Sequence, residues 1–446
     1  MSIDYLDHPK DEKKLRRFQR KVTIVSAGGT FLDGFDLTII AVAMPLIIQQ
    51  WGITPLEQSI LVASAIIGSF IGAAWLGKLT DTFGRKKMIT IDLFAFVIFA
   101  ILTAVAPNVI WLIIFRFLLG VGVGADYPIS ATLVAEFSST KNRGRQGTFL
   151  AMMWFVGAVT AYISGVLLLP LGESAWRWMF LLGALFALII FIFRIGLPES
   201  PRWLASHGRQ EEAQQIIYDL TGNRVEIKPE PQRKVKISYL FSPKLRRRTI
   251  FVTGFWFCYA TAYYGISMYT PTILSAFTEG SQQATYIASS IVSIIGLIGA
   301  FIGMNLVENW GRRPLLITSF AGLTTALVIL TINSQPTLTF LVVLFSVAVL
   351  FSNMGGGILN FVYPTELFPT NIRAGASGFA TSVSRIGSIL GVLVFPNLVA
   401  AWGNSAALGF FAFIGFSGLM ITIFLAPETK GQRLEDINDE SFVEGK

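Results

Sequence analysis

The stretch "GKLTDTFGRKK" (Gly77–Lys87) recurs 227 residues later as "MNLVENWGRRP" (Met304–Pro314), with an acid, a glycine and two basic residues in matched positions. Two further motifs repeat at nearly the same spacing: "EFSSTKNRG" returns as "ELFPTNIRA", and "PESPRWL" returns as "PETKG". A fixed period of this kind is the signature of a repeated structural unit. Three independent markers at nearly one offset predict that the chain contains the same unit twice, in the same orientation.

The composition places both units in a membrane. Of the 446 residues, 53% are hydrophobic and 14% are charged, whereas soluble domains carry about 25% charged residues. A spanning helix needs about 20 mostly apolar residues. The uncharged stretches of sufficient length are Gln58–Gly77, Leu93–Phe115, Gln146–Gly172, Thr249–Thr278, Gly280–Val307, Pro314–Thr365 and Ile386–Pro427. The last two are long enough for two spans each, interrupted at "INSQP" (Ile332–Pro336) and "GNS" (Gly403–Ser405). With polar interruptions allowed elsewhere, we predict an all-α membrane protein of twelve helices in two six-helix repeats.

The basic residues predict the orientation, because cytoplasmic loops collect lysine and arginine. Tails and loops on one side of the predicted membrane hold 32 of the 35. Arg116 and Arg385 lie within spans, and Arg177 alone falls at the outer boundary. We therefore expect a multi-pass plasma-membrane protein, in the inner membrane of a bacterial cell, with both termini cytoplasmic. The expected parts are an N-terminal tail (1–21), a first bundle (22–197), a cytoplasmic linker (198–248), a second bundle (249–426) and a C-terminal tail (427–446).

Several function classes are excluded by the same inventory. The net charge of +8 does not indicate a nucleic-acid partner, because these cations flank membrane spans, where orientation and anionic lipid headgroups account for them. A lone cysteine, Cys258, rules out an intrachain disulfide and a cysteine-based metal cage. With no phosphate loop or metal cluster in the sequence, we expect no cofactor and no enzymatic activity. The first 21 residues are charged and precede a full span, so no cleavable signal peptide is expected.

Two parallel six-helix repeats are typical of transporters whose halves rock about a site near the bilayer midplane. A channel or a membrane enzyme is the structural alternative. A transporter-like receptor is a third, but the 21-residue N-terminal tail and the roughly 20-residue C-terminal tail leave little room for a signalling extension. We expect a transporter that acts as a monomer on a small-molecule substrate.

Five ordered motifs resemble those of the major facilitator superfamily, and more closely its sugar-porter-like branch: "GRKK", "RFLLGVGVG", "PESPRWL", "YPTELFPTNIRA" and "PETKGQRLEDI". Together they cover essentially the whole chain. The resemblance implies that Asp81 and Arg85 make contacts between the halves that hold a cytoplasmic gate shut. The alternative for Arg85 is simple membrane orientation. The motifs and their repeats add Glu136, Arg143, Glu308, Arg312, Glu366 and Arg373 to the expected gate.

Two aspartates interrupt the first span, in "LDGFDLTII" from Leu32. A charge at the centre of a membrane helix costs about 2.5–3.5 kcal/mol, and Asp33 and Asp36 share one helix face. Their natural partner is Arg116 in the fourth span, with Asp126 further along the same span. A static buried ion pair is one interpretation. However, three carboxylates for one arginine leave negative charge that burial would neutralise by protonation. Both histidines lie outside the spans, so we predict that these carboxylates carry protons.

The resemblance refines these roles. "GFD" matches the sugar-porter "GYD", whose aspartate is implicated in coupling together with the arginine of the fourth span; the positions here are Asp36 and Arg116. "DGFD" is also the pattern of aromatic acid:proton symporters, whose paired aspartates correspond to Asp33 and Asp36. "GADYP" is similar to phosphate:proton symporters, which implies a coupling role for Asp126 and a substrate-facing position for Tyr127.

A second buried cation, Arg385, stands in "TSVSRIGSIL" of the eleventh span. It lies about twelve residues from the cytoplasmic end, or about 18 Å deep at 1.5 Å per residue. A guanidinium stays charged and offers a planar fork suited to a carboxylate or phosphate. Pairing with a helix dipole or another acid is the alternative, but the uncharged runs of the second repeat contain no obvious deep acid. We predict that Arg385 binds an anion.

The substrate prediction departs from the family pattern. Where sugar porters carry "QQxSGxN", this chain has "CYATAYYGISMYTPTIL", with Cys258 and Tyr259 at the glutamine positions. A hydroxyl-rich sugar needs paired donors and acceptors, so the hexose interpretation weakens. The expected substrate-binding residues are Arg385, Tyr127, Trp154, Trp256, Tyr259, Tyr263, Tyr264, Asn353 and Asn360. The "GGG" run between the two asparagines predicts either a hinge or dense packing.

An aromatic wall with one deep arginine suits a small organic anion with an apolar or aromatic body. We therefore rank an organic carboxylate first, phosphate second and a neutral sugar or polyol third. The predicted activity is proton-coupled symport by alternating access. Exchange and export use the same residues and stay open.

Overall fold

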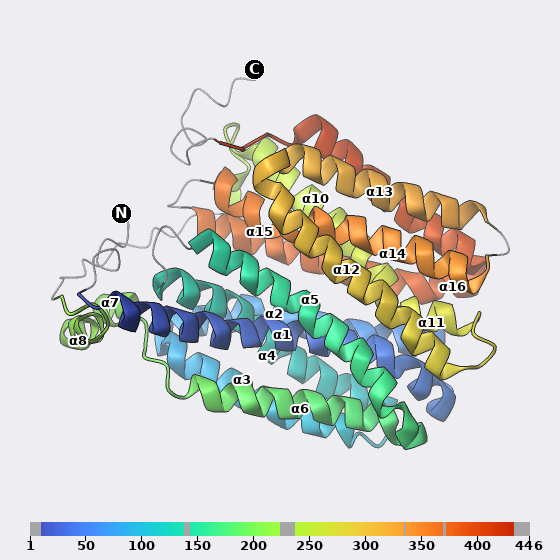
Figure 1. Ribbon diagram of the computed structural model, residues 1–446, viewed down its shortest axis with the longest axis horizontal. Helices are drawn as coiled ribbons and strands as arrows, with labels where there is room; N and C mark the ends of the chain where they lie inside the picture. Colours follow the sequence, from blue (N-terminus) through green and yellow to red (C-terminus); the bar gives the residue numbers. More distant parts are fainter. Residues whose placement is uncertain (1–9, 138–142, 224–236, 334–335, 369–371, 432–446) are drawn as a thin grey trace. The chain divides into compact units, whose positions relative to one another are not determined.

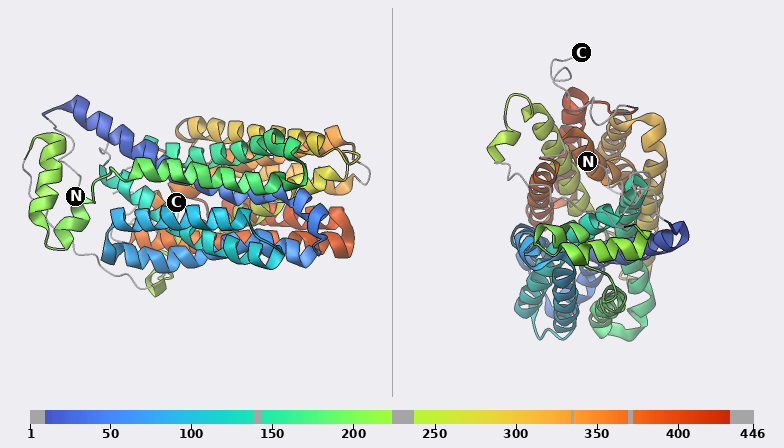
Figure 2. Two further views of the ribbon diagram at one scale, coloured as in Figure 1. Left: turned by 90° about the horizontal axis from the view of Figure 1, so that it is seen from below. Right: turned by 90° about the vertical axis from the view of Figure 1, so that its left-hand side faces the viewer.

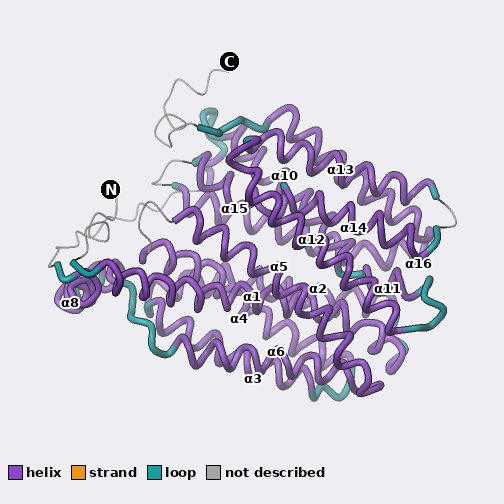
Figure 3. Tube along the Cα trace, in the orientation of Figure 1, coloured by secondary structure: helices purple, strands orange, loops and turns teal. Residues whose placement is uncertain are grey.

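The computed structural model describes residues 10–137, 143–223, 237–333, 336–368 and 372–431. Within these ranges, side chains at 74–82, 125–133, 135–136, 143–148, 202, 237 and 374 are not described. The described residues form helices joined by loops, without a strand (Figure 3).

Six long helices form the first repeat (Figure 1). They are α1 (Glu12–Trp51), α2 (Pro55–Phe83), α3 (Arg85–Ala104), α4 (Val109–Phe137), α5 (Arg143–Leu168) and α6 (Ala175–Arg194), with a 3-10 helix, η2 (Leu169–Ser174), before α6. The uncharged stretch Leu93–Phe115 is not one span: α3 ends inside it and α4 begins inside it.

The second repeat is more interrupted. Its helices are α10 (Arg246–Ser267), α11 (Thr270–Ser275), α12 (Gln282–Trp310), α13 (Arg312–Ile332), α14 (Leu338–Met354), α15 (Gly356–Leu367) and α16 (Arg373–Leu425). Two predicted breaks are confirmed. The first separates α13 from α14 at "INSQP". The second lies inside α16, where Gly403 has φ 81° and ψ 173°, a backbone conformation that glycine adopts readily.

Eight described segments are long and apolar enough to cross a membrane. Two of them contain a non-helical glycine, Gly172 or Gly403, that divides the segment into two spans, which raises the count to ten. The remaining two spans are α4, whose described apolar part is Val109–Gly124, and α10, which carries one tryptophan and three tyrosines. The predicted number of twelve follows.

The chain divides into two compact units. Unit 1 comprises Met1–Leu37, Ile67–Ala158 and Arg177–Pro231, and unit 2 comprises Thr38–Ile66, Val159–Trp176 and Gln232–Lys446. The core of unit 1 joins apolar side chains of α1, α3, α4, α5 and α6. In unit 2, α10 packs along α16, α12 packs along α14, and α13 contacts both α14 and α16 (Figure 1).

The duplication is visible in two matched helix starts. Gly84 (φ 93°, ψ 155°) precedes α3 and Gly311 (φ 97°, ψ 168°) precedes α13. The carboxylate of Glu199 accepts hydrogen bonds from the N–H groups of residues 85 and 86, while Glu428 accepts from those of residues 312 and 313. An anion at a helix N-terminus satisfies unpaired donors and complements the helix dipole. The glutamates of the repeated "PES" and "PET" sequences thus bind the N-terminus of a helix in both repeats.

Close helix contacts follow the repeat as well. A Cβ atom at Gly72 of α2 would overlap the carbonyl of Val121 in α4, and a Cβ atom at Gly299 of α12 would overlap the carbonyl of Leu350 in α14. Small residues at such positions let membrane helices approach backbone to backbone. Gly72 and Gly299 therefore serve helix contact in the first and second repeat, respectively.

Short helices that follow α6 complete unit 1. Helices α7 (Pro201–Ser206) and α8 (Gln210–Thr221) share a small apolar core, and a further short helix, α9 (Ile237–Leu240), belongs to unit 2. The N–H group of Lys10, just before α1, donates to the carbonyl of Thr221 at the end of α8, at 2.8 Å. Figure 2 shows α8 beside the start of α1.

The one basic residue at the outer boundary has a local explanation. The guanidinium of Arg177 donates from Nη1 to the carbonyl oxygens of Ala104 and Ala106, at 2.8 and 2.9 Å. These carbonyls lie at the C-terminal end of α3, where helices leave acceptors unpaired and favour cations. Arg177 therefore caps a helix end, which accounts for its exception to the charge distribution.

Candidate functional site: an acid pair in unit 1 and a tyrosine–arginine cluster in unit 2

Helices α1 and α4 bring the predicted ion pair together in unit 1. Arg116 donates from Nη1 to Oδ1 of Asp36 at 2.9 Å and from Nη2 to the Asp36 carbonyl at 3.2 Å. The Arg116 guanidinium also lies 5.5 Å from the centre of the Phe180 ring. Arg116 is fully buried and Asp36 is 4% exposed. The prediction that these two residues pair is confirmed by the geometry, while their role in coupling remains a prediction.

The pair is incompletely satisfied. Oδ2 of Asp36 and Nε of Arg116 are buried and have no hydrogen-bond partner in the described part of the chain. A buried polar atom without a partner costs free energy, and such atoms commonly mark functional sites. Asp36 thus offers one oxygen that is fixed by the arginine and one that is available to bind a proton. Asp33, one turn earlier, is also buried.

Three other predicted residues of the first repeat are not shown to take part in the site. The side chains of Asp126 and Tyr127 lie outside the described residues. Trp154 belongs to unit 1, where the backbone of α5 passes so close to Gly34 that a Cβ atom there would overlap the Trp154 carbonyl. Its position beside the tyrosines of the second repeat therefore stays a prediction.

In unit 2, three tyrosines of α10 form a continuous buried aromatic surface. The rings of Tyr259 and Tyr263 are stacked with centroids 5.5 Å apart, and Tyr263 meets Tyr264 edge to face at 5.6 Å. Trp256, one turn before Tyr259, is also buried. Aromatic faces and edges of this kind contact apolar or aromatic molecules favourably.

Arg385 of α16 reaches this surface. Its Nη1 donates to the hydroxyl of Tyr264 at 3.4 Å, and the side chain is partly exposed. No carboxylate of the described residues lies within ion-pair distance of it. Residue 385 is twelve residues from the start of α16 at Arg373, which is about 18 Å of helix. Arg385 therefore lies well inside α16, and its guanidinium has no acidic partner in the described part of the protein.

The two predicted amides differ. Asn353 donates from Nδ2 to the Gly296 carbonyl at 3.1 Å, and its Oδ1 lies 3.5 Å from the Tyr259 hydroxyl. The amide thus connects α14 to α12 and supports the tyrosine. Asn360 is buried, and its Oδ1 has no partner among the described residues. Asn360 is the better candidate for a substrate contact.

The glycine run between these amides shows dense packing beside a helix break, and its action as a hinge stays a prediction. The helix breaks at Gly355, between α14 and α15. A Cβ atom at Gly356 would overlap the Tyr259 ring, so this glycine makes room for the aromatic surface. Dense packing and a helix break therefore occur at the same place.

Three of the predicted gate residues form a cluster in unit 2. In unit 2, Arg312 pairs with Glu308 at 2.8 Å and with Glu366 at 2.9 Å, and Arg373 donates to the Phe368 carbonyl at 3.2 Å. Contact between the halves stays a prediction.

In unit 1, Arg85 donates to the Ser200 hydroxyl at 3.4 Å. The side chains of Asp81, Glu136 and Arg143 lie outside the described residues. Sequence reasoning missed the partners Glu199 and Glu428 of the repeated motifs. Partial burial opposes the ionisation of Glu428, but four backbone N–H groups donate to it and lower its pKa below the usual value.

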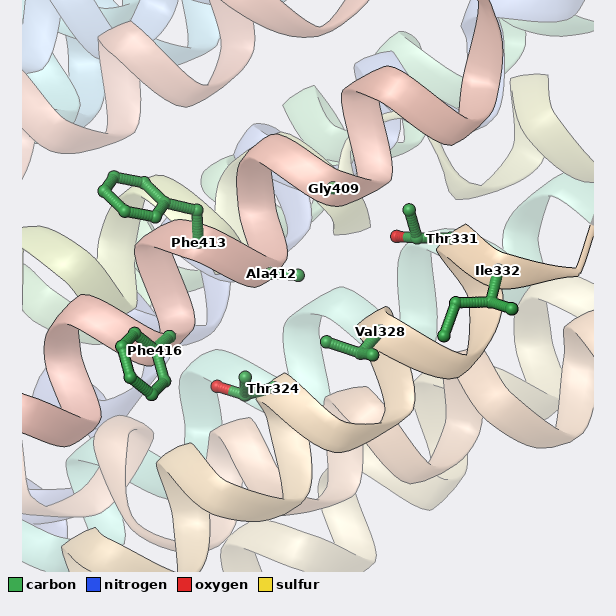
Figure 4. A pocket seen from close by; sticks show the side chains of 8 residues that line it. All are labelled: Thr324, Val328, Thr331, Ile332, Gly409, Ala412, Phe413 and Phe416. Carbon is green, nitrogen blue, oxygen red and sulfur yellow. The ribbon is translucent and has the colours of Figure 1, made fainter.

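A groove of about 290 Å³ lies between α13 and α16 (Figure 4). Its lining is almost wholly apolar, with Val328 and Thr331 on one helix and Ala412 and the exposed Phe413 on the other. Arg385 and the tyrosines are not among its lining residues. The groove therefore lacks the polar groups that fix a small polar substrate.

Known proteins resemble the chain over most of its length. A profile of the family described as "Sugar (and other) transporter" matches residues 21–440. The putative metabolite transport protein YaaU of Escherichia coli (strain K12) is 34% identical over 424 residues, which are 95% of each chain. The niacin transporter NiaP of Acinetobacter baylyi is 29% identical over 420 residues, 92% of this chain and 94% of that protein.

Among solved structures, the xylose transporter XylE from E. coli, in a partially occluded inward-open conformation, matches with a TM-score of 0.79. The match covers 94% of this chain and 100% of that chain at 23% identity. It confirms the predicted fold of twelve helices in two six-helix repeats, and the family match confirms a multi-pass membrane transporter. The chain therefore belongs to the sugar (and other) transporter family, within the major facilitator superfamily.

Proposed function

We propose that this transporter carries a small organic anion, a carboxylate with an apolar or aromatic body, together with protons. The observation that carries the proposal is Arg385, which contacts Tyr264 and has no acidic partner in the described part of the chain. An arginine at such depth costs about 2.5–3.5 kcal/mol. A substrate carboxylate that binds it offsets that cost and gains charge-assisted hydrogen bonds.

The surroundings of Arg385 support the class of substrate. Tyr264, which Arg385 contacts, continues into the rings of Tyr263 and Tyr259, and these offer surface to an apolar or aromatic body. Asn360 on α15 has an amide oxygen without a partner among the described residues, and we propose that it accepts from the substrate. The relative NiaP is a niacin transporter, and niacin is an aromatic carboxylate. We therefore place the substrate carboxylate at Arg385 and its ring against the tyrosines.

The proton would bind at the Asp36–Arg116 ion pair of unit 1. Arg116 holds Oδ1 of Asp36, so Oδ2 is the oxygen that accepts the proton. Protonation removes the negative charge and weakens the attraction that ties α1 to α4. In the proposed cycle, an acid is protonated outside, substrate binds between the repeats, and the neutralised bundle rocks so that both leave inside. Asp33 is the second candidate for the proton.

The topology enters as part of this proposal. The six-helix bundles comprise residues 22–197 and 249–426, the termini face the cytoplasm, and a monomer is the functional unit. The positive-inside distribution of basic residues supports the orientation.

Phosphate and a neutral sugar or polyol are the two alternative substrates. Phosphate is supported by the "GADYP" sequence that includes Asp126 and Tyr127. A sugar or polyol is supported by the family description, but a neutral substrate leaves the charge of Arg385 uncompensated.

Binding of nicotinate and nicotinamide to the purified protein tests the proposal. The two probes differ only in the carboxylate. Charge-assisted hydrogen bonds contribute about 1.5–3 kcal/mol, so we expect nicotinate to bind about 10- to 150-fold more tightly. Arg385→Gln should abolish this preference, whereas Arg313→Gln, at the exposed start of α13, should retain it. Preferential binding of phosphate or xylose that is unchanged by Arg385→Gln contradicts the proposal.

A further inference from the structure

The seventh span is broken in a way that leaves one carbonyl without a helix donor. Helix α10 ends at Ser267 and α11 begins at Thr270. In a continuous helix the Ser267 carbonyl would accept from the N–H group of residue 271. Residue 271 is proline, which has no N–H group. The carbonyl of Ser267 must therefore find a donor elsewhere.

That donor comes from the other repeat. The hydroxyl of Tyr162, on α5, donates to the Ser267 carbonyl at 3.0 Å, and the Tyr162 side chain is 4% exposed. Both residues belong to unit 2. The amide of Gln282 on α12 also donates to Oε1 of Gln49 on α1, at 2.7 Å. In unit 2, the ends of the first-repeat helices remote from the chain termini thus contact the second repeat.

The two contacts differ in their energetic weight. Gln49 is exposed, so water replaces its hydrogen bond when the helices separate. The Tyr162 side chain is buried, its bond to Ser267 is partly buried, and it satisfies a carbonyl that the proline deprives of its normal donor. Losing a buried hydrogen bond while leaving the acceptor unpaired costs more than losing an exposed one.

The Tyr162 contact is also one turn from the proposed anion site. Tyr264 and Ser267 are three residues apart on α10, so they lie on adjacent positions of one helix face. Arg385 donates to the Tyr264 hydroxyl. The last turn of α10 therefore carries a contact to the second-repeat arginine and a contact to the first repeat.

We propose that Tyr162 is a positioning residue of the transport cycle. Its hydroxyl, bound to the carbonyl that Pro271 leaves free, stabilises the state in which the remote ends of the two repeats are closed on each other. Opening that end breaks this bond. The proposal needs only the transporter family of the chain and does not depend on the substrate or on proton coupling.

A closely matched control exists in the same unit. The hydroxyl of Tyr286 is buried and has no hydrogen-bond partner among the described residues, although its ring contacts the same helix at Gly165. Tyr162→Phe and Tyr286→Phe each remove one buried phenolic oxygen, but only Tyr162→Phe removes a hydrogen bond between the repeats.

The test measures closure directly, without substrate. Gln49→Cys and Gln282→Cys are introduced together with Cys258→Ala, and cross-linking by a short bifunctional maleimide is followed in liposomes. One neutral hydrogen bond corresponds to about a fivefold change in an equilibrium. Tyr162→Phe should shift the ratio of closed to open states about fivefold toward open, and Tyr286→Phe should leave it unchanged.

A second variant acts on the other partner. Pro271→Ala restores an N–H group that competes for the Ser267 carbonyl, so it should also shift the ratio toward open. Unfolding midpoints in detergent identify variants that merely lose stability. Unchanged cross-linking in both Tyr162→Phe and Pro271→Ala overturns the proposal, as does an equal shift in Tyr286→Phe.

Discussion

Replacing Arg116 with glutamine isolates the Asp36 carboxylate inside unit 1, because Arg116 is its partner in both ion pairing and hydrogen bonding. Removing one member of a buried pair costs about 3–5 kcal/mol. Protonation of Asp36 limits that cost, because a neutral carboxyl group is cheaper to bury than a carboxylate. Neutralising an ordinary aspartate, with a reference pKa of about 3.9, costs about 4 kcal/mol at pH 7 and about 1.5 kcal/mol at pH 5. We therefore expect Arg116→Gln to lose about 4 kcal/mol of stability at pH 7 and clearly less at pH 5.

Equilibrium unfolding in detergent at the two pH values measures this, with Asp36→Asn and the double variant completing a mutant cycle. The double variant should recover most of the loss, because no charge remains to be buried. Arg313→Gln is the control, since that guanidinium donates to the Ile423 carbonyl and its loss should depend little on pH. The claim that the unpaired Asp36 carboxylate causes the loss of stability would be wrong if the double variant were as unstable as Arg116→Gln. It would also be wrong if Arg116→Gln lost equal stability at both pH values.

Three further predictions follow from individual contacts. Because N–H donors lower the pKa of Glu428, its contribution to stability is present above its unfolded pKa and is lost as the pH falls through the folded one. Glu428→Gln should therefore cost about 0.5–1 kcal/mol at pH 7, after solvent screening, and progressively less as the pH falls through the lowered pKa of the folded state, as unfolding over a series of acidic pH values will show. Gly72→Ala should lower the yield of folded protein, measured by size-exclusion chromatography, while Gly375→Ala, with open space around it, should not. Tyr264→Phe should weaken nicotinate binding less than tenfold, and a complete loss of binding in calorimetry would contradict a supporting role for that hydroxyl.

The large-scale fold was predictable because membrane physics leaves few choices. Uncharged runs, basic loops and the 227-residue repeat predicted twelve helices in two units of six. The interpretation of Leu93–Phe115 as one span was wrong, because the turn between α3 and α4 contains no charged residue. Pro107 and Asn108 are the turn-forming residues in it, and they carried the only local signal of the break.

The site was predictable where chemistry demanded a partner. Asp36 and Arg116 each carry a charge that the membrane disfavours, and the structure pairs them. The roles of Glu199 and Glu428 were not predictable, because each carboxylate reaches a helix start more than one hundred residues earlier in the chain. The proposed role of Tyr162 was not predictable either. The Ser267 carbonyl lacks a helix donor because of Pro271, but only the structure shows that Tyr162 of α5 lies next to it.

The central claim is that Arg385 selects an anion that enters with protons. The most direct measurement reconstitutes the protein in liposomes and records lumenal pH after addition of nicotinate or nicotinamide. The account predicts that nicotinate acidifies the lumen beyond the rate of protein-free liposomes, that nicotinamide does not, and that Arg385→Gln and Asp36→Asn each abolish the signal. Acidification by phosphate or xylose alone, or a nicotinate signal that survives both substitutions, would contradict it.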